Sequence, residues 1–160
     1  MGTGISKTRD QAASRIAARQ NGNITRGQLL GLGMDDRGIA QRVGHGRLFR
    51  VYKGVYAVGR PPVTPVERAA AAVLACGERA LLSHAGALAL WGLTRHWPGH
   101  FDVTLVAGDR RPQGITVHLA TGLTRADARV QLGVPVTSLA RTVLDCAADT
   151  PAERVPRLVN

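Results

Sequence analysis

Three side chains spaced four residues apart, Arg37, Gln41 and His45, are of types that can read nucleic-acid bases. Residues four apart lie on one face of a helix, and Ile39 and Val43 supply apolar residues for the opposite face. Arginine pairs bidentately with the major-groove edge of guanine, and glutamine does so with adenine. The spacing therefore predicts a helix that buries one face in its own core and offers the other to the major groove of DNA.

Further residues on either side of this helix are expected to contact the sugar–phosphate backbone. Thr25 and Arg26 begin a shorter helix, where a hydroxyl, a backbone N–H and a charge can hold a phosphate. A hairpin after the reading helix adds basic and aromatic side chains. With Arg42 on the flank of the reading helix, the expected DNA-binding residues are Thr25, Arg26, Arg37, Gln41, Arg42, His45, Arg47, Arg50, Tyr52 and Lys53.

The elements that must position these side chains are three helices and a hairpin. Apolar residues at helical spacing predict a first helix over 10–20. Thr25, with a glutamine three residues on, begins a capping-box pattern for a second helix, and Asp35 can cap the third. A hairpin over 47–58 follows, with Lys53-Gly54 as its turn. Three short helices before a two-stranded wing predict a winged helix-turn-helix.

The charge of the chain is concentrated on the same segment. The net charge is +10 over 160 residues, and 19 of the 21 basic residues are arginines. Residues 1–60 hold 11 Lys and Arg against three acids, whereas residues 61–160 hold 10 against eight. A charge excess that is gathered on one segment is typical of a nucleic-acid-binding surface.

The sequence divides into four segments, and its fold class is predicted to be α+β. Residues 1–8 are expected to be a flexible tail, and 9–60 the winged helix-turn-helix DNA-binding domain. Residues 61–63 form a proline-containing linker, and 64–160 form a small α+β domain. The elements expected in that domain are helices over 66–76, 84–91 and 139–148, strands over 101–106 and 115–119, an edge segment over 134–136, and a last helical piece from Pro151 to Asn160.

Two groupings of reactive residue types in the second domain are discounted as sites. Ser83 and His84 would need Asp145 to form a nucleophilic triad, but they are adjacent at a helix start and no nucleophile-elbow motif is present. His96 and His100 have the spacing of zinc ligands on a helix, which the proline between them forbids. We therefore expect no catalytic centre, no metal and no cofactor.

The rest of the composition indicates a cytoplasmic protein. Cys76 and Cys146 lie in apolar surroundings without metal-ligand spacing, as reduced, buried cysteines do. The chain has no apolar run long enough to span a membrane and no signal-peptide pattern at its N-terminus.

Three blocks of the sequence resemble the AbiEi family of bacterial antitoxins. The first is Gly46–Val58, which matches the family's wing; the others are Leu82–Leu93 and Val134–Asp145. The resemblance implies a repressor that binds inverted repeats in double-stranded DNA upstream of its own operon. It also implies a type IV toxin–antitoxin system whose toxin is nucleotidyltransferase-like, with no tight binding of the toxin by the antitoxin.

Two alternatives stay open at this point. The chain could be a protein-interaction module that neutralises a toxin by direct contact. It could also be a truncated member of a family whose longer relatives carry a C-terminal nuclease-like domain. For the DNA-binding role we expect a homodimer or a cooperative pair on an inverted repeat, because one small domain binds weakly by itself.

Overall fold

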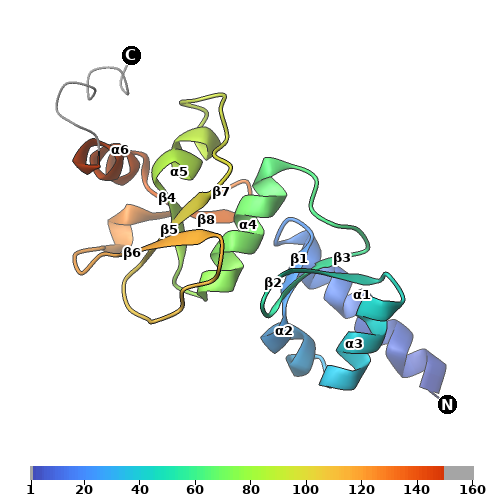
Figure 1. The fold of residues 1–160 in the computed structure, drawn as a ribbon. Helices are drawn as coiled ribbons and strands as arrows, with labels where there is room; N and C mark the ends of the chain where they lie inside the picture. The colour runs from blue at the N-terminus through green and yellow to red at the C-terminus, as the bar shows by residue number, and fades with distance from the viewer. Residues whose placement is uncertain (1, 150–160) are drawn as a thin grey trace. The chain divides into compact units, whose positions relative to one another are not determined.

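The computed structural model describes residues 2–149; Met1 and residues 150–160, including the helical piece expected from Pro151, lie outside this range. The chain divides into two compact units, Met1–Ala75 and Cys76–Asn160 (Figure 1). Each unit combines helices with a sheet, so the predicted α+β class is confirmed.

The first unit contains four helices and a three-stranded sheet. The strands run in the order β1-β3-β2, and both pairings are antiparallel. The elements are α1 (Gly2–Ala18), β1 (Asn23–Thr25), α2 (Arg26–Gly31), α3 (Asp36–Gly44), β2 (Leu48–Tyr52), β3 (Val55–Val58) and α4 (Pro65–Cys76), the last of which ends at the division between the units.

Local signals in the sequence set the bounds of these elements. The Oγ1 of Thr25 accepts a hydrogen bond from the backbone N–H of Gln28, and the Gln28 side chain accepts one from the Thr25 N–H, which completes the predicted capping box. Asp35 caps α3 by accepting from the Gly38 N–H at 2.7 Å. Gly54 turns the hairpin at a φ of 78°, a left-handed conformation that glycine adopts without a Cβ clash.

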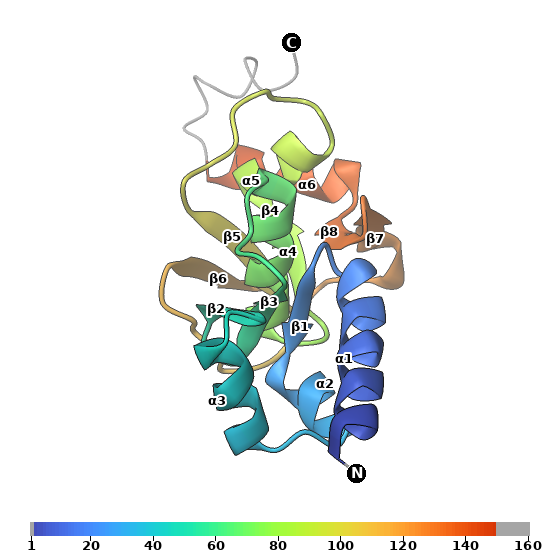
Figure 2. The same cartoon turned by 90° about the vertical axis from the view of Figure 1, so that its right-hand side faces the viewer.

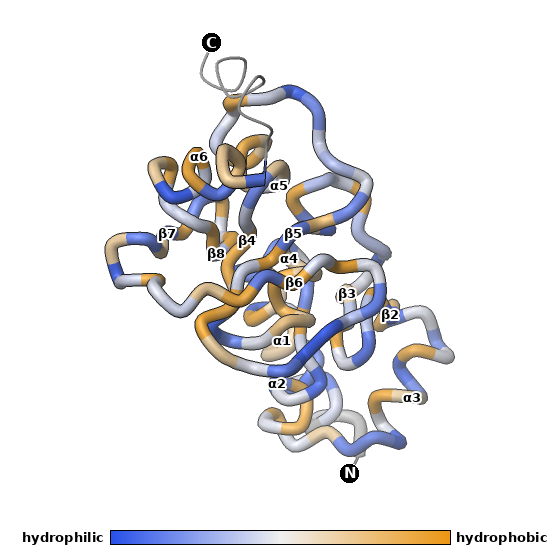
Figure 3. Tube along the Cα trace, turned by 60° about the vertical axis from the view of Figure 1, so that its left-hand side comes forward, coloured by the Kyte–Doolittle hydropathy of each residue, from blue (hydrophilic) through white to orange (hydrophobic). Residues whose placement is uncertain are grey.

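A small apolar core joins the helices of this unit to its sheet. Along α3, hydrophobic residues recur between hydrophilic ones (Figure 3). Burying the apolar residues of each element on one side leaves the polar residues of α3 and the wing to solvent. The buried core residues are Ala13, Ala17, Ile24, Leu29, Met34, Ile39, Leu48 and Tyr56, with Ile16, Leu32, Val43 and Val58 packed against them.

The N-terminus and the start of the sheet differ from the sequence expectation. A flexible tail was expected over 1–8, whereas the structure has residues 2–8 in helix α1. Within α1 the Thr8 hydroxyl donates to the Gly4 carbonyl, and the Ser6 hydroxyl accepts a hydrogen bond from Arg42 of α3. Strand β1 was not predicted, since three residues are too few for a period-two pattern to stand out.

As far as residue 149, the second unit is a mixed five-stranded sheet in the order β6-β5-β4-β8-β7 with two helices, α5 and α6. These helices lie side by side in two perpendicular views (Figures 1 and 2). Strands β4 and β7 are additional to those predicted. The elements are β4 (Leu81–Ser83), α5 (His84–Leu90), β5 (Phe101–Leu105), β6 (Ile115–Leu119), a 3₁₀ turn (Arg125–Asp127), β7 (Ala128–Gln131), β8 (Val134–Thr137) and α6 (Leu139–Ala148).

The prediction that 134–136 is an edge segment is wrong, because β8 lies between β4 and β7. Proline is disfavoured inside a sheet because it cannot donate to a ladder. Here β8 pairs with β4 at a single position, Leu82 with Val136, while Pro135 lies opposite Val130 of β7. Pro135 therefore interrupts no continuous ladder with β4.

Candidate nucleic-acid interface

Helix α3 has one buried and one exposed face, as a groove-reading helix requires. Ile39 is 3% exposed, while Arg37, Gln41 and His45 are all exposed. His45 forms the C-cap, and its N–H donates to the Gln41 carbonyl. Within residues 2–149, no hydrogen bond or ion pair occupies the side chains of Arg37 and Gln41. The outer face of α3 therefore offers donors and acceptors that are available to a ligand.

Arg42 does not belong to that face, which corrects the sequence expectation. Its guanidinium donates to Asp10 at 2.7 Å, to the Ser6 hydroxyl at 3.1 Å and to the Gly38 carbonyl at 3.1 Å. Only 13% of the Arg42 side chain is exposed. The helical wheel placed Arg42 on a flank, and in the fold that flank is covered by α1. Arg42 therefore anchors α3 to α1 and is withdrawn from the DNA-binding set.

Arg26 links the first residue of α2 to the first turn of α3. Its guanidinium makes a two-pronged contact with the Asp36 carboxylate, with N–O distances of 2.8 and 2.7 Å. The hydrogen bond from Arg26 is the main cause that lowers the pKa of Asp36, and the same contact raises the pKa of Arg26. Both groups face solvent, so the pair fixes geometry rather than adding much stability.

The groups of Thr25 and Arg26 that were expected to bind a phosphate are only partly available. The backbone N–H of Arg26 donates to the Gly54 carbonyl at 2.8 Å, so it is not free for a phosphate. The Thr25 hydroxyl oxygen serves the capping box, and the Arg26 charge is compensated by Asp36. The sequence could not reveal these partners, because Asp36 and Gly54 lie 10 and 28 residues away in the chain.

The wing presents basic side chains along β2 and at its tip. Arg50 is exposed, and its guanidinium carbon lies 5.9 Å from the ring centroid of Tyr56, within cation–π range. Lys53 is exposed in the turn, and Tyr52 is partly buried. Arg47 is 65% exposed and contacts the second Asp10 oxygen at 3.3 Å. Arg47, Arg50 and Lys53 thus keep exposed charges for a polyanion.

Two helices packed at a short turn, with an exposed helix face and a basic hairpin, define a winged helix-turn-helix protein. The family model described as "Transcriptional regulator, AbiEi antitoxin" matches residues 11–59. The match confirms the predicted resemblance to the AbiEi family for this segment, which carries α2, α3 and the wing. No curated protein gives a significant match to the chain. No helix within 2–149 is long and apolar enough to cross a bilayer.

The discounted groupings of the second unit also have defined geometry. Asp145 accepts from Arg141 at 2.7 Å, one helical turn away, instead of contacting His84. Ser83 precedes α5 but makes no side-chain cap; its Oγ lies 2.9 Å from Nδ1 of His84. His96 and His100 are exposed in the loop before β5. The grouping that sequence reasoning missed joins His84 to residues on β6 and at the end of α6.

Proposed function

We propose that this protein is a DNA-binding transcriptional repressor of its own toxin–antitoxin operon and the antitoxin of a type IV system. The single observation that carries the proposal is the unpaired polar face of α3 beside a basic wing. The AbiEi match over 11–59 supports the regulatory role. Such a role requires no catalytic centre, cofactor or metal in the first unit.

In the proposed complex, α3 lies in the major groove and the wing follows the backbone. Arg37 would pair with O6 and N7 of guanine, and Gln41 with N6 and N7 of adenine. His45 continues the same face. Arg47, Arg50, Tyr52 and Lys53 would contact phosphates or the adjacent minor groove. Thr25 and Arg26 take a secondary place, because Arg26 reaches a phosphate only if its pair with Asp36 opens.

The DNA sequence that the protein binds is proposed to be an inverted repeat, with one chain on each half-site. One winged unit presents few base contacts, so specific affinity needs a homodimer or cooperative binding. Half-sites would then be about 34–36 Å apart, or a multiple of that spacing. The toxin is proposed as a functional partner encoded in the same operon, without a tight complex.

The experiment is a fluorescence anisotropy titration of the full chain with its own upstream DNA and with a scrambled duplex of equal length. Arg37→Ala and Gln41→Ala should each weaken specific binding by about 5–150-fold, the cost of one bidentate base contact, and leave scrambled-DNA binding nearly unchanged. Arg95→Ala, which removes one exposed charge from the second unit, is the matched control.

Equal binding of both duplexes by the unmodified chain would refute sequence-specific repression. If a variant carrying both Arg37→Ala and Gln41→Ala kept the preference for upstream DNA, the assignment of α3 as the reading helix would be wrong. Tight co-purification with the toxin, in the absence of DNA binding, would support the rival role of neutralisation by contact.

A further inference from the structure

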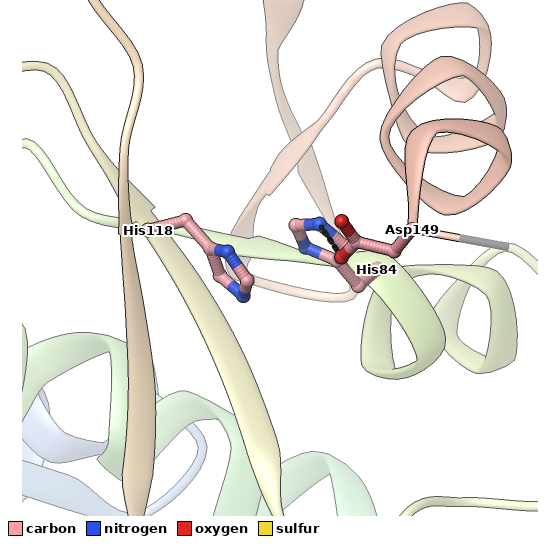
Figure 4. Close-up of side chains that lie close together, drawn as sticks. All are labelled: His84, His118 and Asp149. Atoms are coloured by element: carbon pink, nitrogen blue, oxygen red, sulfur yellow. Dashed lines mark ion pairs between the residues drawn. The ribbon is translucent and has the colours of Figure 1, made fainter.

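The second unit brings together three side chains of metal-ligating types that are distant in sequence. His84 begins α5, His118 lies on β6 and Asp149 follows α6, and one ligand atom from each lies within 4.8 Å of the others (Figure 4). Nε2 of His84 is 3.1 Å from Oδ2 of Asp149. The two imidazole rings are stacked, with centroids 4.0 Å apart and planes inclined by 22°.

Each histidine is held by a neighbouring polar side chain. Nδ1 of His84 lies 2.9 Å from the Ser83 hydroxyl, and Nε2 of His118 lies 2.8 Å from Oδ1 of Asp102. The parallel β5–β6 register places Asp102 opposite Thr116, two residues before His118, so both side chains project from the same face of the sheet. Partners of this kind orient the histidines of metal sites and fix their tautomers.

The backbone at His84 is also unusual. Its φ is 52°, in the left-handed region that non-glycine residues rarely occupy, and such strain is concentrated at functional sites. Burial, followed by the nearby His118, lowers the pKa of His84.

We propose that His84, His118 and Asp149 bind one divalent transition-metal ion of the zinc type. Two imidazoles and one carboxylate are the donor set of many three-ligand zinc sites, and they leave a fourth coordination position open. Asp102 and Ser83 act as orienting residues behind the two histidines. The site is separate from the interface on α3 and the wing, and it does not depend on the proposed repressor role.

The geometry meets the requirement of the ion only in part. An imidazole binds an ion in its ring plane, so the stacked rings of His84 and His118, inclined by 22°, must turn relative to each other before both face one ion. Tetrahedral ligands at about 2.0–2.1 Å from zinc are about 3.4 Å from one another. The His84–Asp149 separation of 3.1 Å already fits. The widest separation must close by up to about 1.4 Å. The side chains of Asp149 and His118 are 62% and 30% exposed and have room to adjust, whereas that of His84 is 12% exposed. Metal binding would join the end of α6 to β6 and to the start of α5.

The test is zinc binding to tag-free full chain, measured by competition with a chromogenic zinc chelator and by the visible spectrum of the Co²⁺ form. The expected result is one zinc per chain and a zinc-dependent rise in Tm. Asp149→Ala and His118→Ala should weaken binding at least about 100-fold, and Asp102→Asn about 10–100-fold. His96→Ala, at an exposed histidine outside the cluster, is the control and should bind as the unmodified chain does.

Circular dichroism checks that each variant is folded, and Asp149→Ala, at an exposed helix end, keeps the test valid if His118→Ala unfolds. Three results would overturn the proposal: no saturable uptake of zinc or cobalt, equal uptake by the folded Asp149→Ala variant, or loss of uptake with His96→Ala. A DNA-binding defect without a change in zinc uptake would bear on the repressor role alone.

Discussion

The Arg42→Ala variant tests whether Arg42 stabilises the first unit or contacts DNA. The guanidinium makes three hydrogen bonds, one of them to the Asp10 carboxylate at 2.7 Å, while only 13% of the side chain is exposed. A hydrogen bond to a charged group contributes about 1.5–3 kcal/mol, and weaker bonds to Ser6 and Gly38 add to it. Asp10 keeps Arg47 as a partner and is itself 31% exposed, which limits the loss.

We therefore expect Arg42→Ala to lower the free energy of unfolding of the first unit by about 2–3 kcal/mol. In urea denaturation followed by circular dichroism, this corresponds to a midpoint shift of about 1–2 M. Arg37→Ala, one and a half turns away on the exposed face, should change stability by less than about 0.5 kcal/mol and reduce DNA affinity instead.

The refuting result is the opposite pattern. If Arg42→Ala left the urea midpoint unchanged while weakening binding to upstream DNA at a temperature where the chain is fully folded, Arg42 would be a DNA contact. The assignment of Arg42 as the residue that anchors α3 to α1 would then be wrong. A double-mutant cycle with Asp10→Ala isolates the pair, and zero coupling would also contradict the anchor.

Three further predictions concern charge, pH and backbone strain. Asp36→Asn should release Arg26 for a phosphate, so that DNA binding tightens and the slope of log affinity against log salt steepens by about 0.9; weaker binding at low salt would contradict this. Hydrogen bonds, chiefly from Arg60, lower the pKa of Glu67 to about 2, so its stabilising contribution is full above about pH 4.5 and is lost as pH falls toward 2. Glu67→Gln should therefore flatten the acid limb of a pH–Tm profile, and an unchanged limb would refute it. Gly54→Ala, at a φ of 78° with open space around it, should lower Tm by about 4–8 °C, whereas Gly44→Ala in α3 should not lower it; equal effects would exclude backbone strain as the cause.

The features that could be predicted from the sequence are those that depend on residues close together in the chain. Helical periodicity and caps located α2, α3 and the hairpin, because the Thr25 and Asp35 caps and the Gly54 turn depend on neighbouring residues. It also placed Arg37 and Gln41 on the exposed face of α3, because Ile39 fixes the rotation of the helix.

The sequence could not predict contacts between distant elements. A helical wheel shows Arg42 on a flank but not that α1 covers that flank. The central position of β8 depends on pairing with β4, about 50 residues earlier, and the proposed site of His84, His118 and Asp149 joins three elements that are far apart in the sequence. Such pairings follow from the packing of the whole unit, and no short motif encodes them.

The hydrogen bond from the Arg26 N–H to the Gly54 carbonyl has a consequence for the choice of operator. It fastens the hairpin tip to the start of α2, while the Arg26–Asp36 pair fastens α2 to α3. Reading helix and wing are thereby held at a set spacing, so in the proposed complex the duplex must adjust its groove width to the protein. Deformation then costs least at flexible pyrimidine–purine steps, and base preference would extend to positions that no side chain touches.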